Sequence, residues 1–256
     1  MKSLIKKIAH SDIGLSFRNT FNVKPMPINI NNSKSVSVSD SFIWRTDSNF
    51  RTKFKYTDIL NLFYKTKNTW VEFHFYTKEN RLIKIEKYKN LDISNEIEIN
   101  SKFLGDIEDY GTFYIYHYSE KEIEGENIIS NRCYLGYSQD QKLFSFVHGN
   151  VYAKSSEIYG NQKISSNILK TSLFKNKYYK IQKYFDNYDR SELIFANPTS
   201  KTIRFSINNC NYQIKPGCSR LVDISDIKII NIKSNCLLLR PTVFSYKESF
   251  LDVHHS

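Results

Sequence analysis

Residues 112–118 read Thr112-Phe113-Tyr114-Ile115-Tyr116-His117-Tyr118, and nearly every side chain in this run is aromatic or β-branched. Such side chains favour β-strands because they pack well on a pleated, half-buried surface. Gly111 precedes the run and supplies a turn signal at its start. The run therefore predicts a β-strand.

The rest of the chain repeats this pattern of short strands between turn residues. Residues 71–76 and 81–87 flank a polar connection and predict a hairpin, and residues 132–137 and 143–147 predict another. Pro216-Gly217 predicts a type II turn, since Pro fixes φ at the second position and Gly accepts a positive φ at the third. Further strands are expected at 96–100, 193–196, 201–207, 212–214, 221–224, 228–232 and 236–239.

The composition points to the same fold class. The 256 residues include 18 Tyr and 18 Phe but only three Ala, the residue that most favours helices. Short strands spaced about 8–12 residues apart are typical of a sandwich or barrel. We expect a mostly β fold, an antiparallel β-sandwich or jelly-roll-like arrangement with two packed β-lobes and one or two short helices.

One short helix is expected at residues 56–64. Asp58 or the preceding threonine can cap its N-terminus. Ile59, Leu62 and Phe63 share a face at i, i+3 and i+4, which predicts that this face is buried.

Changes in composition divide the chain into four parts. Residues 1–39 are expected to be irregular or extended, and residues 40–160 to form the first β-lobe. Residues 161–176 belong to a Ser- and Asn-rich stretch with little periodicity, which predicts a linker or long loop. Residues 177–256 are expected to form a second, smaller β-lobe that leans on the first for stability.

The net charge of +11 is unevenly distributed. The 37 basic residues are 28 Lys and nine Arg. Proteins that recognise specific bases rely mainly on Arg, because its planar guanidinium forms two hydrogen bonds to guanine. Residues 86–126 reverse the sign, with eleven acids against four Lys. Sequence-specific nucleic-acid binding is therefore not expected. The enrichment in Lys, Asn, Ile, Tyr and Phe is explained by a low-GC genome, because AT-rich codons encode these five residues.

The sequence predicts a cytoplasmic protein with reduced thiols. Lys6 and Lys7 interrupt the apolar stretch that a signal peptide would need. No window contains the roughly 18 to 20 apolar residues of a membrane-spanning helix. The four cysteines form no C-x-x-C pair and lie in apolar segments, where free Cys packs as a small hydrophobe. They are Cys133, Cys210, Cys218 and Cys236.

Several catalytic signatures are missing from the sequence. Only eight Gly occur, and neither a G-x-G-x-x-G run nor a Walker-type run is present. The serine-hydrolase motif G-x-S-x-G and the zinc-protease motif H-E-x-x-H are also missing. No cofactor is expected, with a divalent metal as the alternative.

Residues 41–52 contain the side chains that a sugar site needs. Trp44 offers a ring for stacking, while Arg45 and Asp47 offer planar hydrogen-bonding groups. The competing interpretation is that Trp44 anchors the core and that Arg45 and Asp47 form an ordinary i, i+2 pair. Both interpretations stay open at this point.

Three further residues complete the predicted ligand site. Trp70 is the second tryptophan, and the same two interpretations apply to it: it either anchors the core or contacts a ligand. His148 lies at the end of an expected strand and is followed by Gly149, so it is a candidate pocket residue together with Tyr152.

A metal site is the alternative chemistry. Asp252 and His254 would share one face of an extended chain at i, i+2, and His117 and His148 lie on or beside expected strands. These four residues are the predicted ligands. The competing interpretation is that the last histidines belong to a frayed tail.

Basic and aromatic residues interleave in residues 174–188. Such a segment can hold single-stranded nucleic acid or an anionic glycan, with rings stacking and Lys neutralising charge. An amphipathic strand explains the pattern equally well. The residues are Phe174, Lys175, Lys177, Tyr178, Tyr179, Lys180, Lys183, Tyr184, Phe185 and Tyr188.

Together these observations favour a carbohydrate-binding or surface-polysaccharide-associated β-protein without an evident catalytic motif. One alternative is a metal-dependent jelly-roll-type enzyme acting on a sugar or small molecule, so the sequence leaves open whether the protein is an enzyme. A second is a structural or assembly protein of a phage or cell envelope, for which an oligomer is expected.

Overall fold

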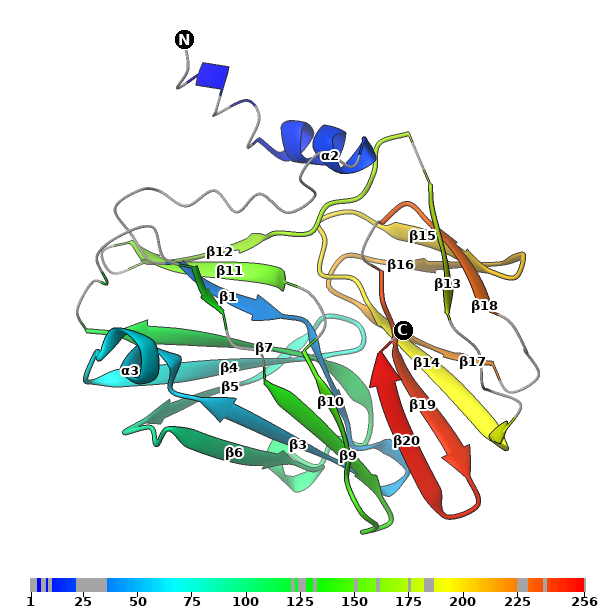
Figure 1. The fold of residues 1–256 in the computed structure, drawn as a ribbon, viewed down its shortest axis with the longest axis horizontal. Helices are drawn as coiled ribbons and strands as arrows, with labels where there is room; N and C mark the ends of the chain where they lie inside the picture. Colours follow the sequence, from blue (N-terminus) through cyan, green and yellow to red (C-terminus); the bar gives the residue numbers. More distant parts are fainter. Residues whose placement is uncertain are drawn as a thin grey trace.

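The computed structural model describes residues 4–5, 8, 11–21, 36–120, 123, 128–130, 133–149, 152–159, 162–174, 176–181, 187–224, 230–236 and 239–255. These residues form five four-stranded sheets, each named here by one of its central strands (Figure 1). The pairing is antiparallel except between β1 and β8. The prediction of a mostly β, antiparallel fold is confirmed.

Two sheets contain most strands of the first half of the chain. The β7 sheet has the order β2 (Phe42–Arg45), β7 (Tyr110–Ser119), β4 (Thr69–Thr77) and β5 (Leu82–Lys89). The β3 sheet has the order β10 (Ser145–His148), β9 (Tyr134–Gln139), β3 (Phe50–Thr57) and β6 (Ser94–Ile99). The hairpins predicted for these segments are present as the β4–β5 and β9–β10 pairs.

Three further sheets complete the fold. The β1 sheet has the order β12 (Gln162–Asn167), β11 (Tyr152–Tyr159), β1 (Val36–Asp40) and β8 (Ile128–Ser130). The β14 sheet has the order β17 (Ser219–Asp223), β14 (Arg190–Ala196), β19 (Thr242–Lys247) and β20 (Phe250–His255). The β15 sheet has the order β13 (Lys177–Ile181), β18 (Ile230–Ser234), β15 (Ile203–Ile207) and β16 (Cys210–Ile214).

The sheet arrangement differs from the expected β-sandwich or jelly-roll-like fold with two packed β-lobes, since a sandwich or jelly roll is built from two sheets. Five four-stranded sheets match the sheet count of a five-bladed β-propeller. Strands that are distant in the sequence nevertheless join one sheet, as when β3 pairs with both β6 and β9. Local alternation of apolar and polar residues identifies a strand but not its partners, which is why the sheet arrangement was not predictable.

Strand β7 is buried on both of its faces. On one face Phe73 and Phe113 meet Phe54 of the β3 sheet, with ring centres 5.6 Å and 5.0 Å from that of Phe54. On the other face Tyr118 packs toward the β1 sheet, where its hydroxyl lies 2.7 Å from Ser156 Oγ. This double burial explains the unbroken aromatic and β-branched run of β7.

The β14 sheet also contributes to two clusters of buried side chains. Ile194 and Phe244 join the aromatic cluster between the β7 and β3 sheets. Leu193 and Phe195 point the other way, into a cluster with the β15 sheet, where the rings of Phe195 and Phe205 are 4.7 Å apart. The division into a 40–160 lobe and a 177–256 lobe stays a prediction.

Two α-helices are bounded in the described part of the chain, α2 (Asp12–Thr20) and α3 (Ile59–Tyr64). Asp58 caps α3 as predicted, because its carboxylate accepts a hydrogen bond from the backbone N–H of Asn61. The predicted buried face is wrong: α3 buries Ile59 and Leu60, whereas Phe63 is 70% exposed. Two short 3-10 turns, η1 (Asp47–Asn49) and η2 (Lys102–Leu104), are also present. No described helix is long and apolar enough to cross a bilayer.

Three expectations about irregular segments are corrected. Helix α2 lies within residues 1–39, which were expected to be irregular or extended, and the side chain of Ser11 supports the start of α2 by accepting from the N–H of Gly14. Strand β12 lies within residues 161–176, where a linker or long loop was expected. The Ser and Asn side chains of this stretch, which suggested a loop, also suit a polar strand at the edge of a sheet. The C-terminal residues form the β19–β20 hairpin instead of a frayed tail.

The predicted turn at Pro216-Gly217 is confirmed. Gly217 has φ of 74° and Cys218 N–H donates to the carbonyl of Lys215, as a type II turn requires. All four cysteines are free thiols. Cys210 is exposed at the start of β16, which differs from the expected apolar environment.

Candidate functional site

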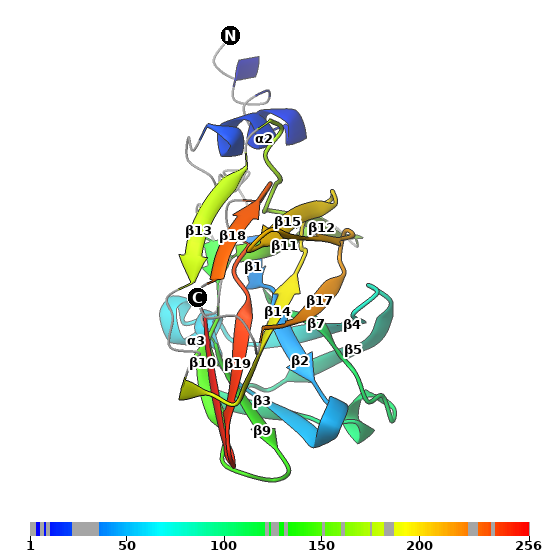
Figure 2. The same cartoon turned by 90° about the vertical axis from the view of Figure 1, so that its right-hand side faces the viewer.

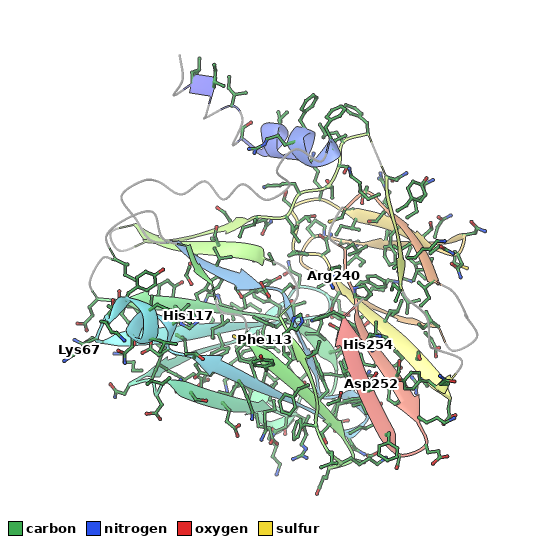
Figure 3. All side chains as sticks on the ribbon, in the orientation of Figure 1. Lys67, Phe113, His117, Arg240, Asp252 and His254 are labelled. Atoms are coloured by element: carbon green, nitrogen blue, oxygen red, sulfur yellow. The ribbon has the colours of Figure 1, made fainter. Side chains whose placement is uncertain are left out.

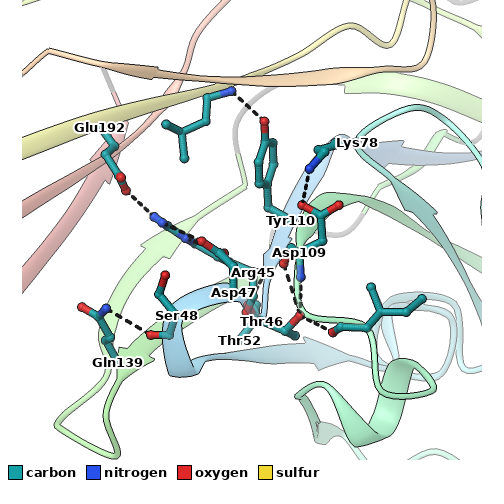
Figure 4. A network of polar contacts seen from close by, with 12 residues as sticks. Arg45, Thr46, Asp47, Ser48, Thr52, Lys78, Asp109, Tyr110, Gln139 and Glu192 are labelled. Atoms are coloured by element: carbon teal, nitrogen blue, oxygen red, sulfur yellow. Dashed lines mark hydrogen bonds and ion pairs between the residues drawn. The ribbon is translucent and has the colours of Figure 1, made fainter.

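Trp44 and Arg45 are part of the interior of the molecule. Trp44 is 0% exposed, and its indole N–H donates to the backbone carbonyl of Tyr76 at 2.9 Å. Arg45 is 3% exposed and pairs with Asp47 and with Glu192 of β14 (Figure 4). These contacts leave neither the Trp44 ring nor the Arg45 guanidinium facing solvent.

The groups around Arg45 favour the protonated, positively charged form of its guanidinium. Burial acts to lower the pKa of Arg45, but the hydrogen bonds that its guanidinium donates to Asp47 and the charges of Asp47 and Glu192 raise this pKa above its ordinary value. Tyr246 donates to Glu192 and also contacts Arg45. Arg190 forms a further ion pair with Glu192. The network is a structural link between the β7 and β14 sheets.

The three other predicted ligand residues lie on three different strands, β4, β10 and β11. Trp70 is half-buried on β4, where its ring contacts Tyr118 and the ammonium of Lys87 lies 4.4 Å from the ring centre. His148 is exposed at the end of β10. Tyr152 begins β11 opposite Asp40, and its side chain lies outside the described residues.

Among the four predicted metal ligands, His117 lies apart from the pair Asp252 and His254 (Figure 3). His117 is buried in β7, and this burial lowers its pKa to about 3. Asp252 and His254 share a face of β20, with His254 Nδ1 3.4 Å from a carboxylate oxygen. The ring near His148 is that of His255, 5.7 Å away between ring centres. Within the described ranges, no three His, Cys, Asp or Glu side chains gather to hold a metal.

A surface rich in hydrogen-bonding side chains lies on the outward face of the β15 sheet, which we call the basic face. Ile203, Phe205 and Ile207 of β15 point into the core, so period-two alternation turns Arg204 and Ser206 outward. The same alternation operates in the other three strands. The outward residues are Tyr178 and Lys180 of β13, Asn231 and Lys233 of β18, Arg204 and Ser206 of β15, and Asn211 and Gln213 of β16.

Strand register arranges these residues in rows across the sheet. Tyr178 lies opposite Lys233, Lys233 opposite Ser206, and Ser206 opposite Asn211. Directly opposed residues have Cβ atoms about 4.5–5.5 Å apart, so the row is continuous. A two-residue Asn208-Asn209 turn with positive φ at both positions joins β15 to β16 and fixes this register.

A cavity of about 820 Å³ is lined by five residues of the basic face together with residues outside it, among them Phe205, Tyr212 and Arg220. Two adjoining cavities of about 590 Å³ and 380 Å³ share lining residues with it, Asn176 and Arg204 in one case and Lys233 in the other. None of the three is lined by a carboxylate. The main cavity is lined by Asn176, Arg204, Phe205, Ser206, Asn209, Asn211, Tyr212, Gln213, Arg220 and Lys233.

The cations of this cavity form no ion pairs with carboxylates of the described residues. The Lys233 ammonium lies 5.5 Å from the centre of the Tyr178 ring, and the Arg220 guanidinium lies 5.2 Å from that of Tyr212. Lys53, on the outward face of the β3 sheet, differs in that its ammonium is 3.3 Å from Glu96. The charges of the basic face are therefore available to an anionic ligand.

The sequence indicated part of this surface. In the segment 174–188, Tyr178 and Lys180 lie on the basic face and Phe174 lines the adjoining cavity, whereas Lys177 is buried and donates to the carbonyl of Thr20. Tyr188 instead donates to Asp252. Lys175, Lys183, Tyr184, Phe185 and the side chain of Tyr179 lie outside the described residues.

The other residues of the basic face were missed. Alternation in residues 201–207 was visible and marks Arg204 as outward-facing. It does not show that Lys233 and Gln213 lie on the two strands that flank β15, because that depends on strand order.

No protein-family model, curated protein or solved structure matches the chain.

Proposed function

We propose that the protein binds an acidic carbohydrate on the basic face. The observation that carries this proposal is the lining of the main cavity, which combines three cations, four amide side chains and a tyrosine with no carboxylate. Ligand sites of this type commonly have volumes of about 300–1,000 Å³, so the cavity suits a short oligosaccharide.

Each type of side chain matches one feature of such a ligand. The amides of Asn176, Asn211 and Gln213 can donate to and accept from sugar hydroxyls. Arg204 and Lys233 provide charge for a uronate carboxylate or a sulfate ester. Tyr212 presents a partly exposed ring against which a pyranose can pack.

The proposal keeps the carbohydrate class expected from the sequence but places it elsewhere. Trp44 and Arg45 were the expected contacts, and both are engaged in the interior. Truncation of Trp44 would therefore report on core stability and not on sugar binding.

A glycan array that includes neutral, uronate-containing and sulfated glycans tests the proposal. We expect binding to acidic glycans, followed by a loss of affinity of about tenfold or more for Arg204→Ala and for Lys233→Ala in calorimetry, because each removes a charge-assisted hydrogen bond. Lys53→Ala is the matched control, since Lys53 is an outward-facing strand cation that is paired with Glu96. An array without signal, or equal losses in all three variants, would rule the proposal out.

Single-stranded nucleic acid is a second candidate ligand. It is favoured by Tyr178, which is 73% exposed beside Lys233, and by Phe174, which is 82% exposed in the adjoining cavity. Bases stack on such rings with little sequence preference. Fluorescence anisotropy with labelled homopolymer oligonucleotides, run beside the glycan array, discriminates the two ligands.

The two other hypotheses from the sequence have less support. A metal-dependent enzyme would need His117 near His148, Asp252 and His254, and His117 is buried in β7. Elemental analysis of untagged protein tests it. A role in assembly requires an oligomer, which size-exclusion chromatography with light scattering measures.

A further inference from the structure

Six large apolar side chains are exposed on the N-terminal segment. Ile13 is 76% exposed, and Phe17 and Phe21 are each 52% exposed with their ring centres 4.7 Å apart. Leu4, Ile5 and Ile8 also have helical backbone and are each about 60% exposed. Together these six residues are called the N-terminal apolar surface.

Polar groups of helix α2 contact the body of the protein. Ser16 is 4% and Thr20 is 1% exposed, and Thr20 Oγ1 accepts a hydrogen bond of 2.8 Å from the backbone N–H of Leu173. The carbonyl of Thr20 accepts another from Lys177. A surface helix of a globular protein normally buries its apolar stripe and exposes its polar residues, whereas in α2 the described side chains of Ile13 and Phe17 are exposed and those of Ser16 and Thr20 are buried.

This apolar surface lies in a basic region. Residues 1–21 contain four Lys or Arg and one Asp. The cavity beside Leu173 and Phe174 is lined by Lys201 and Arg204 and by no carboxylate. Figures 1 and 2 show α2 at one end of the molecule, beyond the sheets, where a flat partner can reach it.

We infer that the N-terminal apolar surface binds the surface of an anionic lipid bilayer. Exposed apolar side chains combined with basic residues are the two features of helices that lie in the membrane interface. Binding of a second copy would bring two basic segments together, with a net charge of +11 on each chain, so charge complementarity favours an anionic surface. The inference rests on α2 and its neighbours, not on glycan binding at the basic face.

Co-sedimentation with vesicles tests this inference. We expect the full chain to bind phosphatidylcholine vesicles that contain phosphatidylglycerol, to bind pure phosphatidylcholine vesicles more weakly, and to lose affinity as salt is raised. The double variant Ile13→Ser, Phe17→Ser should reduce binding to the anionic vesicles by about tenfold or more, since it removes two apolar side chains that enter the interface.

Leu143→Ser is the matched control, because Leu143 is 89% exposed in the β9–β10 connection, at the opposite end of the molecule from α2 (Figure 1). It should bind like the unaltered chain. Circular dichroism melting of the double variant checks that the fold is retained. Vesicle binding that is absent, or equally strong in the double variant, would overturn the inference. So would light scattering that shows a dimer dissociated by the double variant, since the surface then binds a second copy.

Discussion

Arg45 of β2 and Glu192 of β14 form a buried ion pair in which Nη1 and Oε2 lie 2.6 Å apart. The two residues are 147 positions apart in the sequence, and their side chains are 3% and 1% exposed. The pair therefore fixes the β14 sheet against the β7 sheet at one buried point.

Glu192→Ala is expected to lower the free energy of unfolding by about 3–5 kcal/mol, because it leaves part of the Arg45 charge buried without its partner. Urea unfolding measures the change. Glu96→Ala, which breaks the more exposed pair with Lys53, should cost less than about 1 kcal/mol. Equal costs for the two variants would show that the buried pair contributes no more than a surface pair.

His117 is expected to make the protein acid-sensitive. Burial lowers its folded-state pKa to about 3, whereas the unfolded chain titrates near about 6.5. Between these values the unfolded state binds more protons, so stability is complete above about pH 6.5 and is lost as pH falls, by up to about 1.4 kcal/mol per pH unit.

Urea unfolding at about pH 7 and about pH 5 checks this expectation for the unaltered chain and for His117→Gln. The variant should lose less stability between the two pH values. His148→Gln, which replaces an exposed histidine, should keep the full loss. An unchanged loss in His117→Gln would assign the acid sensitivity to other groups.

Gly111→Ala is expected to destabilise the fold strongly. A Cβ at this position would lie 2.1 Å from the carbonyl oxygen of Tyr76 and 2.8 Å from the Trp44 ring, so backbone or core must shift. The cost should reach about 3 kcal/mol. Gly105→Ala is the control: no atom lies within 4 Å, and only its φ of 80° opposes the substitution, at about 1 kcal/mol. A smaller loss of thermal stability for Gly111→Ala than for Gly105→Ala would contradict the steric argument.

Salt dependence should identify the cations that bind the proposed acidic glycan. Affinity is expected to fall with rising salt because the ligand neutralises exposed charge. Arg204→Ala should flatten a plot of log affinity against log salt, whereas Lys53→Ala should leave the slope unchanged. A slope that is the same in both variants would place the ligand away from the basic face.

The sequence predicted individual elements well where they depend on neighbouring residues. The alternation of Ile97 and Ile99 with polar residues identified β6, and Pro216-Gly217 identified its turn. Asp58 identified the start of α3. The buried face of α3 was wrong because Leu60, and not Phe63, points to the interior, and this depends on what the helix packs against.

The residues of the candidate site were less accessible to prediction. Trp44 carries the chemistry of a sugar platform, but the same ring fills the core between two sheets. Arg204, Gln213 and Lys233 carry no distinctive motif, and they form a site only because three strands bring them to one face.

By itself the sequence determined a β-rich, basic chain, the positions of most strands and turns, and the side of each strand that faces inward, because these follow from the period-two alternation and turn chemistry of adjacent residues. Only the tertiary structure decided which strands pair, that Arg45 meets Glu192, and that the cations of the β15 sheet share one cavity. Strand order is set by the packing of residues far apart in the chain, and no local pattern encodes it.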